Sequence, residues 1–247
     1  MDILIGIDDT DNKDSRGTGF RARQLGQLIE AKGLGEILGI SRHQLYVHDL
    51  IPYTSKNSSA CLEVNNISAY DKLNNLCREF LLEDSAPGSD AGLAVAVSSE
   101  ISEEIMNWGN KAKVEILKKT TAYELALKNN ISLEGLTGDK IGIIGALAAI
   151  GLRKGGNDGR FIWLKGIELR EISGIYTKQE LTKILRFDDV ITEKFDSINN
   201  NENILLEYWI RPVLKQNKIY IFVEKVENNG KYKWKIKSKD YIRSISE

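Results

Sequence analysis

An acidic motif near the start of the chain is the strongest sign of chemistry in this sequence. Three carboxylates follow the apolar run Ile3-Leu4-Ile5, in the string Gly6-Ile7-Asp8-Asp9-Thr10-Asp11. Carboxylates this close repel one another, and burial without a cation raises their pKa values. Mg²⁺ removes that cost, and it typically takes one or two protein carboxylates and leaves its other positions to phosphate and water. The motif therefore predicts a Mg²⁺ site at Asp8, Asp9 and Asp11, with a solvated acidic turn as the alternative.

A glycine-containing loop and a predicted helix follow the acidic motif. The loop reads Arg16-Gly17-Thr18-Gly19-Phe20-Arg21, and apolar residues recur at helix spacing over Thr18–Lys32. A helix start offers free N–H groups and a partial positive charge to an anion. Glycines let the backbone approach a phosphate, and the two arginines would neutralise it. The residues expected to bind phosphate in this loop are Arg16, Gly17, Gly19 and Arg21. The alternative is an ordinary strand-to-helix turn in which Thr18 is the N-cap.

Composition excludes several classes of protein. The chain has 247 residues, 42% of them hydrophobic and 28% charged, and a net charge of -1, so any nucleic-acid surface must be local. The two cysteines, Cys61 and Cys77, form no C-x-x-C pair, and only two histidines, His43 and His48, are present. His-rich zinc catalysis is therefore not expected. With no membrane-spanning apolar run and no signal peptide, we expect a cytoplasmic protein without a membrane partner.

Patterning predicts the elements that would position these residues. Beyond the first helix, strands are expected at Leu45–Leu50 and Ala60–Val64, and a tightly packed buried helix at Ile141–Gly151. A capping box at Thr121-x-x-Glu124 predicts the start of another helix. The glycine-rich segment Leu152–Gly159 is predicted to be a loop and the boundary between two domains.

The predicted fold class is α+β (mixed α/β), with domains at residues 1–152 and 153–247. The second domain is expected to end in a hairpin, with strands at Ile219–Val226 and Lys231–Lys237 around a turn at Glu227–Gly230. The last of these segments alternates lysine with tyrosine, tryptophan and isoleucine. Such a strand can track a phosphate backbone, but we favour an edge strand that its lysines protect from aggregation.

Two further groups of residues are weaker candidates. Lys56 and Asn57, in the polar loop after Ile51-Pro52-Tyr53, would suit contact with a phosphate or a base, although a plain surface loop is slightly favoured. Gly142 and Gly145 lie near a predicted helix start. They fit either phosphate contact or close helix packing, and packing is favoured.

Several of these strings resemble the archaeal tRNA-Ile agmatidine synthetase family (TiaS). The matching strings, in family order, are Gly6–Asp11, Arg16-Gly17, Ile51-Pro52-Tyr53, Ala86-Pro87-Gly88 and Ile144–Gly151. The resemblance covers roughly Met1 to Val226. It implies a kinase-like domain that binds ATP and Mg²⁺, followed by a small ferredoxin-like domain. In that family, ATP activates a carbonyl of the wobble cytidine and agmatine is then attached; an OB-fold and a zinc ribbon, not expected here, complete the family enzyme.

The resemblance also implies roles for single residues. The expected catalytic residues are Asp8, Asp9, Asp11 and Thr18, and the expected cofactor-binding residues are Gly6, Thr10, Arg16, Gly17, Gly19 and Arg21. In the family, a threonine of the Arg-Gly loop is phosphorylated, and Phe20 stands at its position here. Thr18 is the only hydroxyl between Gly17 and Leu25, so it is the residue that would replace that threonine.

The leading hypothesis is an ATP- and Mg²⁺-dependent ligase or phosphotransferase that activates a carbonyl oxygen of a nucleobase or of a small molecule. Expected partners are a nucleotide and either RNA or a small-molecule acceptor, with a separate RNA-binding protein as a further candidate. The alternative is a non-catalytic nucleotide-sensing or RNA-binding subunit, which the change at Phe20 favours. A phosphatase of the Asp-x-Asp-x-Thr kind ranks lowest, because the corresponding string ends in Lys13.

Overall fold

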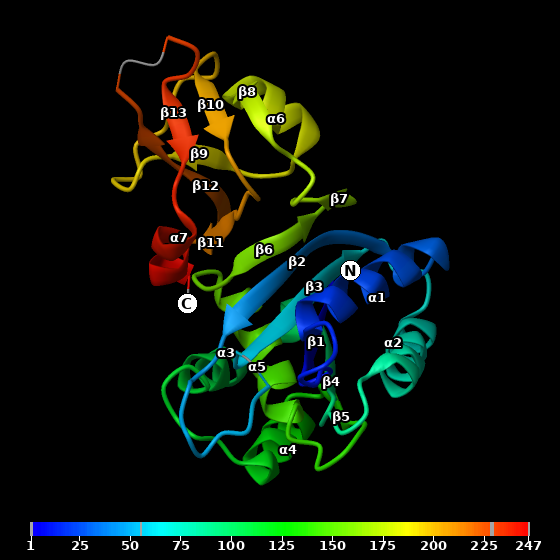
Figure 1. Ribbon diagram of the computed structural model, residues 1–247. Coiled ribbons are helices and arrows are strands. Elements are labelled where there is room, and N and C mark those ends of the chain that lie inside the picture. Colours follow the sequence, from blue (N-terminus) through cyan, green and yellow to red (C-terminus); the bar gives the residue numbers. More distant parts are fainter. Residues whose placement is uncertain (1, 55, 228–229, 247) are drawn as a thin grey trace. The chain divides into compact units, whose positions relative to one another are not determined.

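The chain forms two compact units of mixed α/β structure, residues 1–155 and 156–247 (Figure 1). The computed structural model describes residues 2–54, 56–227 and 230–246. The mixed α/β class predicted from the sequence is confirmed. Within the described ranges, no helix is long and apolar enough to cross a membrane. The names kinase-like and ferredoxin-like for the two units remain predictions.

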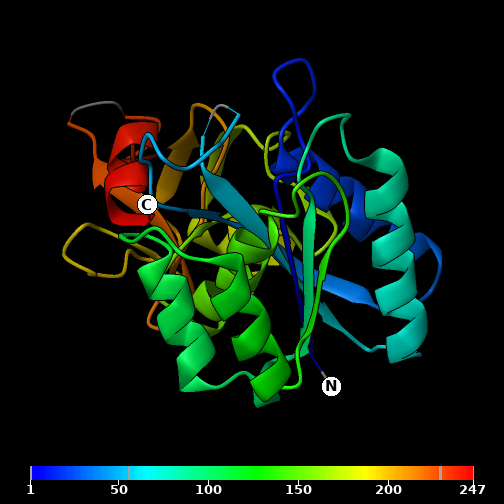
Figure 2. The ribbon, with the colours of Figure 1, turned by 90° about the horizontal axis from the view of Figure 1, so that it is seen from below.

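The first unit is built on an antiparallel sheet with the strand order β5-β4-β1-β3-β2. Its elements are β1 (Ile3–Asp8), α1 (Thr18–Ala31), β2 (Glu36–Gln44), β3 (Ser58–Asn65), α2 (Tyr70–Asp84), β4 (Gly92–Val97), the 3₁₀ turn Ser98–Glu100, α3 (Glu103–Lys111), α4 (Lys119–Lys128), β5 (Ser132–Gly135) and α5 (Ile143–Gly155). Helices α1 and α2 cover one face of the sheet, and α3, α4 and α5 cover the other (Figure 2). Strand β1 lies in the middle and is buried along its whole length, as its apolar sequence predicts.

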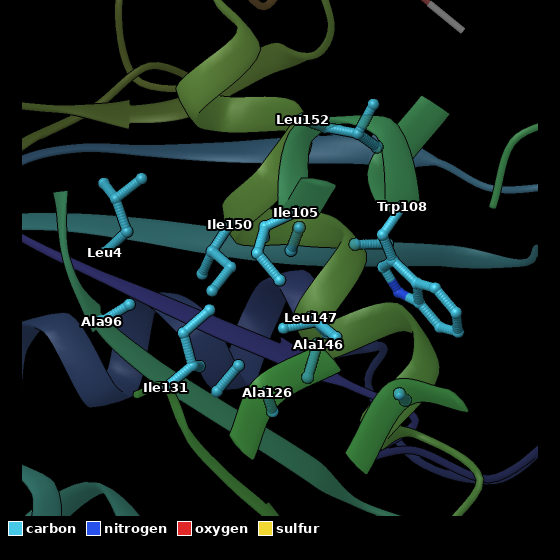
Figure 3. Packing of buried hydrophobic residues seen from close by; sticks show 14 of the residues in the cluster. Leu4, Ala96, Ile105, Trp108, Ala126, Ile131, Ala146, Leu147, Ile150 and Leu152 are labelled. Carbon is cyan, nitrogen blue, oxygen red and sulfur yellow. The ribbon is translucent and has the colours of Figure 1, made fainter. Parts of the chain in front are cut away.

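One part of the core of this unit lies between the sheet and helices α3, α4 and α5 (Figure 3). Leu4 and Ala96 come from the sheet and pack against apolar side chains of the helices, among them Ile105 and Ile150. Trp108 adds a polar contact, because its indole Nε1–H donates to the Ile144 carbonyl oxygen at 3.1 Å. Helix α3 therefore holds the first turn of α5 in place, next to the end of β1.

One strand prediction in this unit is wrong. Residues 45–50 form no strand; the strand of this region is β2, which ends at Gln44. The Leu45 amide still donates to the Asn57 carbonyl oxygen at 2.9 Å, but the Tyr46 amide donates at 2.9 Å to the carbonyl oxygen of Ala112, outside the sheet. The chain therefore leaves the sheet after Gln44, and the loop that follows returns to β3 through Asn57.

Two helix boundaries also differ from prediction. The predicted capping box at Thr121 is wrong: α4 already begins at Lys119, after the N-cap residue Lys118, which makes no side-chain cap bond. The predicted loop from Leu152 is wrong as well, because α5 continues to Gly155. The buried Leu152 side chain packs against Gly109 of α3, and that contact carries the helix past the expected boundary.

The second unit contains mixed β-strands and two helices. Its elements are β6 (Arg160–Leu164), β7 (Ile167–Glu168), β8 (Gly174–Thr177), α6 (Lys178–Ile184), β9 (Asp189–Ile191), β10 (Asn203–Leu206), β11 (Val213–Lys215), β12 (Lys218–Lys225), β13 (Trp234–Ile236) and α7 (Lys239–Ser246). The strands follow the order β6-β11-β12-β13-β10-β8, with β7 beside β6 and β9 beside β12. Phe161, Leu181 and Val223 are among the side chains that form its core.

The predicted hairpin is confirmed, but its second strand is not an edge strand. Strands β12 and β13 pair antiparallel, and β13 also pairs with β10 on its other side. The lysines of this segment pair with acids: the Lys235 ammonium lies 3.1 Å from a Glu224 carboxylate oxygen, and that of Lys237 lies 3.2 Å from the other oxygen. The favoured edge-strand interpretation is therefore wrong. Residues 228 and 229 of the predicted turn lie outside the described residues.

Candidate functional site

A cavity of about 460 Å³ in the first unit collects most of the residues that could do chemistry. Its charged and hydroxyl lining comprises Asp8, Asp9, Asp11, Thr18, Thr54, Lys56, Ser58, Glu115, Lys118, Lys119 and Thr120. Its apolar lining comprises Leu45, Leu50, Ile51, Pro52, Tyr53, Ala112, Ile116, Leu117, Ile141 and Ile144. The volume falls within the range of small-molecule sites, and the mixture of an apolar wall with a few convergent charges is typical of them.

The carboxylates of the acidic motif line this cavity together. Asp8 is the last residue of β1, and its side chain is only 9% exposed. Asp9 follows at a positive φ of 51°, a conformation that Asp tolerates better than most residues. This turn of the backbone lets two neighbouring residues, which would point to opposite faces of a strand, both reach the cavity.

Burial raises the pKa values of two of these carboxyl groups, those of Asp8 and Asp9. Burial, reinforced by the charge of Asp9, raises the pKa of Asp8 to about 8. Burial, followed by the charges of Asp90 and Asp11, raises the pKa of Asp9 to about 6. A proton or a cation must therefore compensate this part of the cavity at neutral pH.

Asp11 and Thr18 are joined by hydrogen bonds rather than directed separately into the cavity. One oxygen of Asp11, Oδ1, accepts from the Thr18 amide at 3.2 Å and from the Thr18 hydroxyl at 2.9 Å. The Thr10 hydroxyl in turn donates to Thr18 Oγ1 at 3.2 Å. The N-cap residue of α1 is Gly17, so the alternative assignment of Thr18 as N-cap is wrong. Asp11 satisfies the first helical amide from outside the helix.

The six predicted cofactor-binding residues are not part of the described cavity lining. Those outside it are Gly6, Thr10, Arg16, Gly17, Gly19 and Arg21. The Arg16 guanidinium lies 4.5 Å from the centre of the Phe20 ring, and Arg21 donates to Gln24 Oε1 at 3.4 Å. Gly6 faces α5, where a Cβ atom would clash with the Ala146 carbonyl oxygen. A phosphate-binding role for these six residues remains a prediction.

The start of α5 closes the cavity beside Asp8. A Cβ atom on Gly145 would clash with Asp8 Oδ2, and one on Gly142 would come 2.8 Å from the Asp8 carbonyl oxygen. Both glycines also line the cavity. Their lack of a side chain therefore allows the close packing that the sequence favoured, and the same feature opens room for the Asp8 carboxylate.

Sequence reasoning missed the side of the cavity formed by residues 112–120. Lys118, Lys119 and Thr120 line the cavity from the start of α4, with Ile116 and Leu117 before them. They lie about a hundred positions along the chain from the acidic motif, so no local pattern links the two. The one available signal was the polar run before the predicted capping box. Lys56 and Asn57, weighed as a surface loop, also line the cavity.

The donor set fits Mg²⁺ that is brought in by a phosphate ligand better than a metal held by protein alone. In the described part of the chain, no group of three or more His, Cys, Asp or Glu side chains is arranged to hold a metal ion. Asp8 and Asp9 line the cavity, while Asp11 Oδ1 is already engaged by Thr18. Two carboxylates with raised pKa values, completed by phosphate and water, match the usual coordination of Mg²⁺.

Comparison with known proteins shows which proteins share sequence or fold with this chain. No family model matches the sequence. The chain is 32% identical over 154 residues to Uncharacterized protein MJ0921 of Methanocaldococcus jannaschii, a match that covers 61% of this chain and 49% of that protein. The chain therefore spans about half the length of the curated relative it matches.

Three solved structures share the fold over 61% of this chain. Apo TiaS, an agmatidine synthetase that acts on an isoleucine tRNA, is 22% identical with a TM-score of 0.53, over 35% of its own length. A complex of TiaS with that tRNA and ATP is 24% identical with a TM-score of 0.54, over 36% of its length. A tRNA fluorescent labeling enzyme is 24% identical with a TM-score of 0.54, over 36% of its length. At these identities the likeness shows the fold, and the chain has a TiaS-like fold over the matched part.

Proposed function

We propose that this chain is an ATP- and Mg²⁺-dependent enzyme that activates a carbonyl oxygen, in a nucleobase or a small molecule, by phosphoryl transfer. The observation that supports this most is the gathering of Asp8, Asp9 and Asp11 at one cavity whose volume suits a nucleotide. The fold adds support, because one structure that shares it is a TiaS complex with a tRNA and ATP.

Asp8 and Asp9 share one task in this proposal, and Asp11 has another. Asp8 and Asp9 hold Mg²⁺, which when bound neutralises charge on the transferred phosphoryl group. Asp11 keeps its bond to Thr18 and offers its second oxygen to the metal or to a water molecule on it. Positioning and charge neutralisation then lower the activation barrier, as is usual for phosphoryl transfer.

Thr18 is the proposed site of a covalent phosphoryl intermediate. Its hydroxyl oxygen lies 2.9 Å from Asp11 Oδ1, the position of a base that removes a proton. In such a step, Thr18 Oγ1 forms a bond to the γ-phosphorus of ATP, the bond from that phosphorus to the β,γ-bridging oxygen breaks, and ADP leaves. The hydroxyl proton passes to Asp11.

The non-catalytic alternative has its own support in the same contacts. The Thr18 side chain is buried, its oxygen accepts from Thr10 and its hydroxyl donates to Asp11. A threonine used in this way anchors the start of α1 whether or not it reacts. A nucleotide-sensing subunit would retain this anchor and bind Mg²⁺-ATP without consuming it.

Turnover and labelling decide between the two functions. The protein is incubated with Mg²⁺-ATP, nucleotide products are measured by chromatography, and Thr18 is examined by mass spectrometry. The proposal expects product formation that Asp9→Asn abolishes, together with phosphate on Thr18. The Thr18→Ser variant should keep the label and Thr18→Val should lose it. ATP binding without turnover would contradict the enzyme and support the sensing subunit.

A further inference from the structure

Two consecutive lysines at the start of α4 line the same cavity as the acidic motif. Lys118 is the N-cap residue of α4 and Lys119 is its first residue. Both residues therefore line the cavity from the start of this helix. Hereafter these two residues are called the lysine pair. Glu115 also lines the cavity, at the end of the same loop.

Within the described part of the chain, the lysine pair has no acidic partner. The Lys119 ammonium donates to the backbone carbonyl oxygen of Asp139, a neutral acceptor. Among the described residues, no carboxylate forms an ion pair with Lys118 or Lys119, whereas Lys128, at the other end of α4, lies 2.6 Å from Glu104. Two neighbouring lysines therefore line the cavity without an ion pair from the described residues to offset their charge.

The acidic residues and the lysine pair line the same cavity, so a ligand there has to suit both. The cavity is lined by Asp8 and Asp9, whose carboxyl groups suit a cation, and by the lysine pair, which suits an anion. A phosphate that carries a divalent cation meets both requirements, since each of its oxygens can contact either the metal or an ammonium group.

We propose that the lysine pair binds a phosphate group of the ligand in this cavity. The inference rests on the proposed function, and it assigns the phosphate contact to α4 rather than to the loop before α1. The described cavity lining includes Lys118 and Lys119 but neither Arg16 nor Arg21. The phosphate belongs either to the nucleotide or to the backbone of an RNA acceptor, and binding measurements separate these two sources.

The experiment compares charge removal inside and outside the cavity. Affinities for Mg²⁺-ATP, for adenosine and for an RNA hairpin are measured by calorimetry with four proteins. These are the unmodified chain, K118A/K119A, R16A/R21A, and the control K32A/K72A, which removes the same charge from exposed positions outside the cavity. Because a hydrogen bond to a charged group contributes a factor of about ten or more, K118A/K119A should weaken Mg²⁺-ATP binding by about that factor. Adenosine, which has no phosphate, should bind all four proteins equally.

Each outcome has a definite meaning. Weaker Mg²⁺-ATP binding by K118A/K119A alone supports a nucleotide phosphate, and weaker RNA binding with unchanged Mg²⁺-ATP binding supports an RNA phosphate. Unchanged affinity for both ligands, an equal loss for adenosine, or a loss confined to R16A/R21A would overturn the role of the lysine pair. Failure of the unmodified chain to bind Mg²⁺-ATP would instead contradict the proposed function.

Discussion

Asp8 is a single side chain whose burial makes its charge depend on protons and cations. Its carboxyl group lies at the end of a fully buried strand, beside Asp9 and beneath the start of α5. Burial and the charge of Asp9 raise its pKa from 3.8 to about 8. Since its raised pKa means that the folded chain binds this proton more tightly than the unfolded chain, Asp8 stabilises the fold at low pH, and that contribution is lost as pH rises toward 8.

The first prediction concerns the pH dependence of stability without Mg²⁺. Asp8→Asn cannot ionise, so its stability relative to the unmodified chain should improve from about pH 5 to about pH 8, by about 1 kcal/mol or more. Urea unfolding across this range measures the difference. Asp14→Asn, at an exposed position, serves as the control. A constant difference between Asp8→Asn and the unmodified chain would show that Asp8 is ionised throughout.

The second prediction concerns the link between Asp11 and α1. Asp11→Ala removes the acceptor for the Thr18 amide and hydroxyl, so the free energy of unfolding should fall by about 0.5–2 kcal/mol, as for loss of a helix cap. Asp14→Ala, three positions along the same loop, should change it by less than about 0.5 kcal/mol. Equal stability of the two variants in urea unfolding would show that the Asp11 bonds contribute nothing.

Among the candidate site residues predicted from the sequence, four that are close together in the chain line one cavity, and their role there remains a prediction. Asp8, Asp9, Asp11 and Thr18 come together because the end of one strand and the start of the next helix position all four. Lys118 and Lys119 reach the same cavity only through packing of α3, α4 and α5, which no local pattern encodes. That part of the site needed the structure.

At the scale of elements, contact between α5 and the central strand determines the shape of the site. Gly6 and Gly145 are two of the close-contact positions, since a Cβ atom at either would clash with the opposing element. The helix can therefore lie almost directly on β1 and Asp8. A wider separation would open the apolar core to the cavity.

The third prediction tests this packing. Gly145→Ala should lower the free energy of unfolding by about 1–3 kcal/mol through overpacking, and should weaken Mg²⁺-ATP binding because it displaces Asp8. Gly155→Ala, at the end of the same helix with no atoms near its Cβ position, should be neutral or should stabilise by about 0.5–1 kcal/mol. Thermal melting and calorimetry measure both effects. A Gly145→Ala variant as stable as Gly155→Ala would contradict the close packing.

Strong periodic patterns predicted elements correctly, whereas boundaries depended on contacts distant in sequence. The buried helix predicted at Ile141–Gly151 and the strand predicted at Ala60–Val64 are both present, as α5 and within β3. Two local signals pointed elsewhere: Thr121 looked like a helix start, and Leu152 looked like the beginning of a loop. Burial of Leu152 against Gly109 extends α5, and this tertiary contact outweighs the local glycine-rich pattern.

For the whole molecule, charge limits what kind of partner it can hold without specific contacts. The net charge is -1, and several lysines of the second unit are paired with acids, as between Lys235 and Glu224. Little positive field remains to attract a polyanion. Any binding of RNA would therefore rely on a few local contacts.

The fourth prediction follows from this balance. Full-length tRNA should bind weakly to this chain, and the affinity should fall steeply with salt, since a few lysine–phosphate contacts release counterions when they form. Gel-shift experiments across a salt series measure the slope. Tight, anticodon-selective binding at physiological salt would show a recognition surface that the charge distribution does not indicate.

The central claim is that the acidic motif binds Mg²⁺-ATP, and thermal melting tests it most directly. At about 100 times its dissociation constant, the ligand should stabilise the fold by about 2.7 kcal/mol. The shift should require both Mg²⁺ and ATP, and Asp9→Asn should lose it while melting cooperatively on its own. An unchanged melting temperature at millimolar Mg²⁺-ATP, or a shift that Asp9→Asn retains in full, would contradict the account.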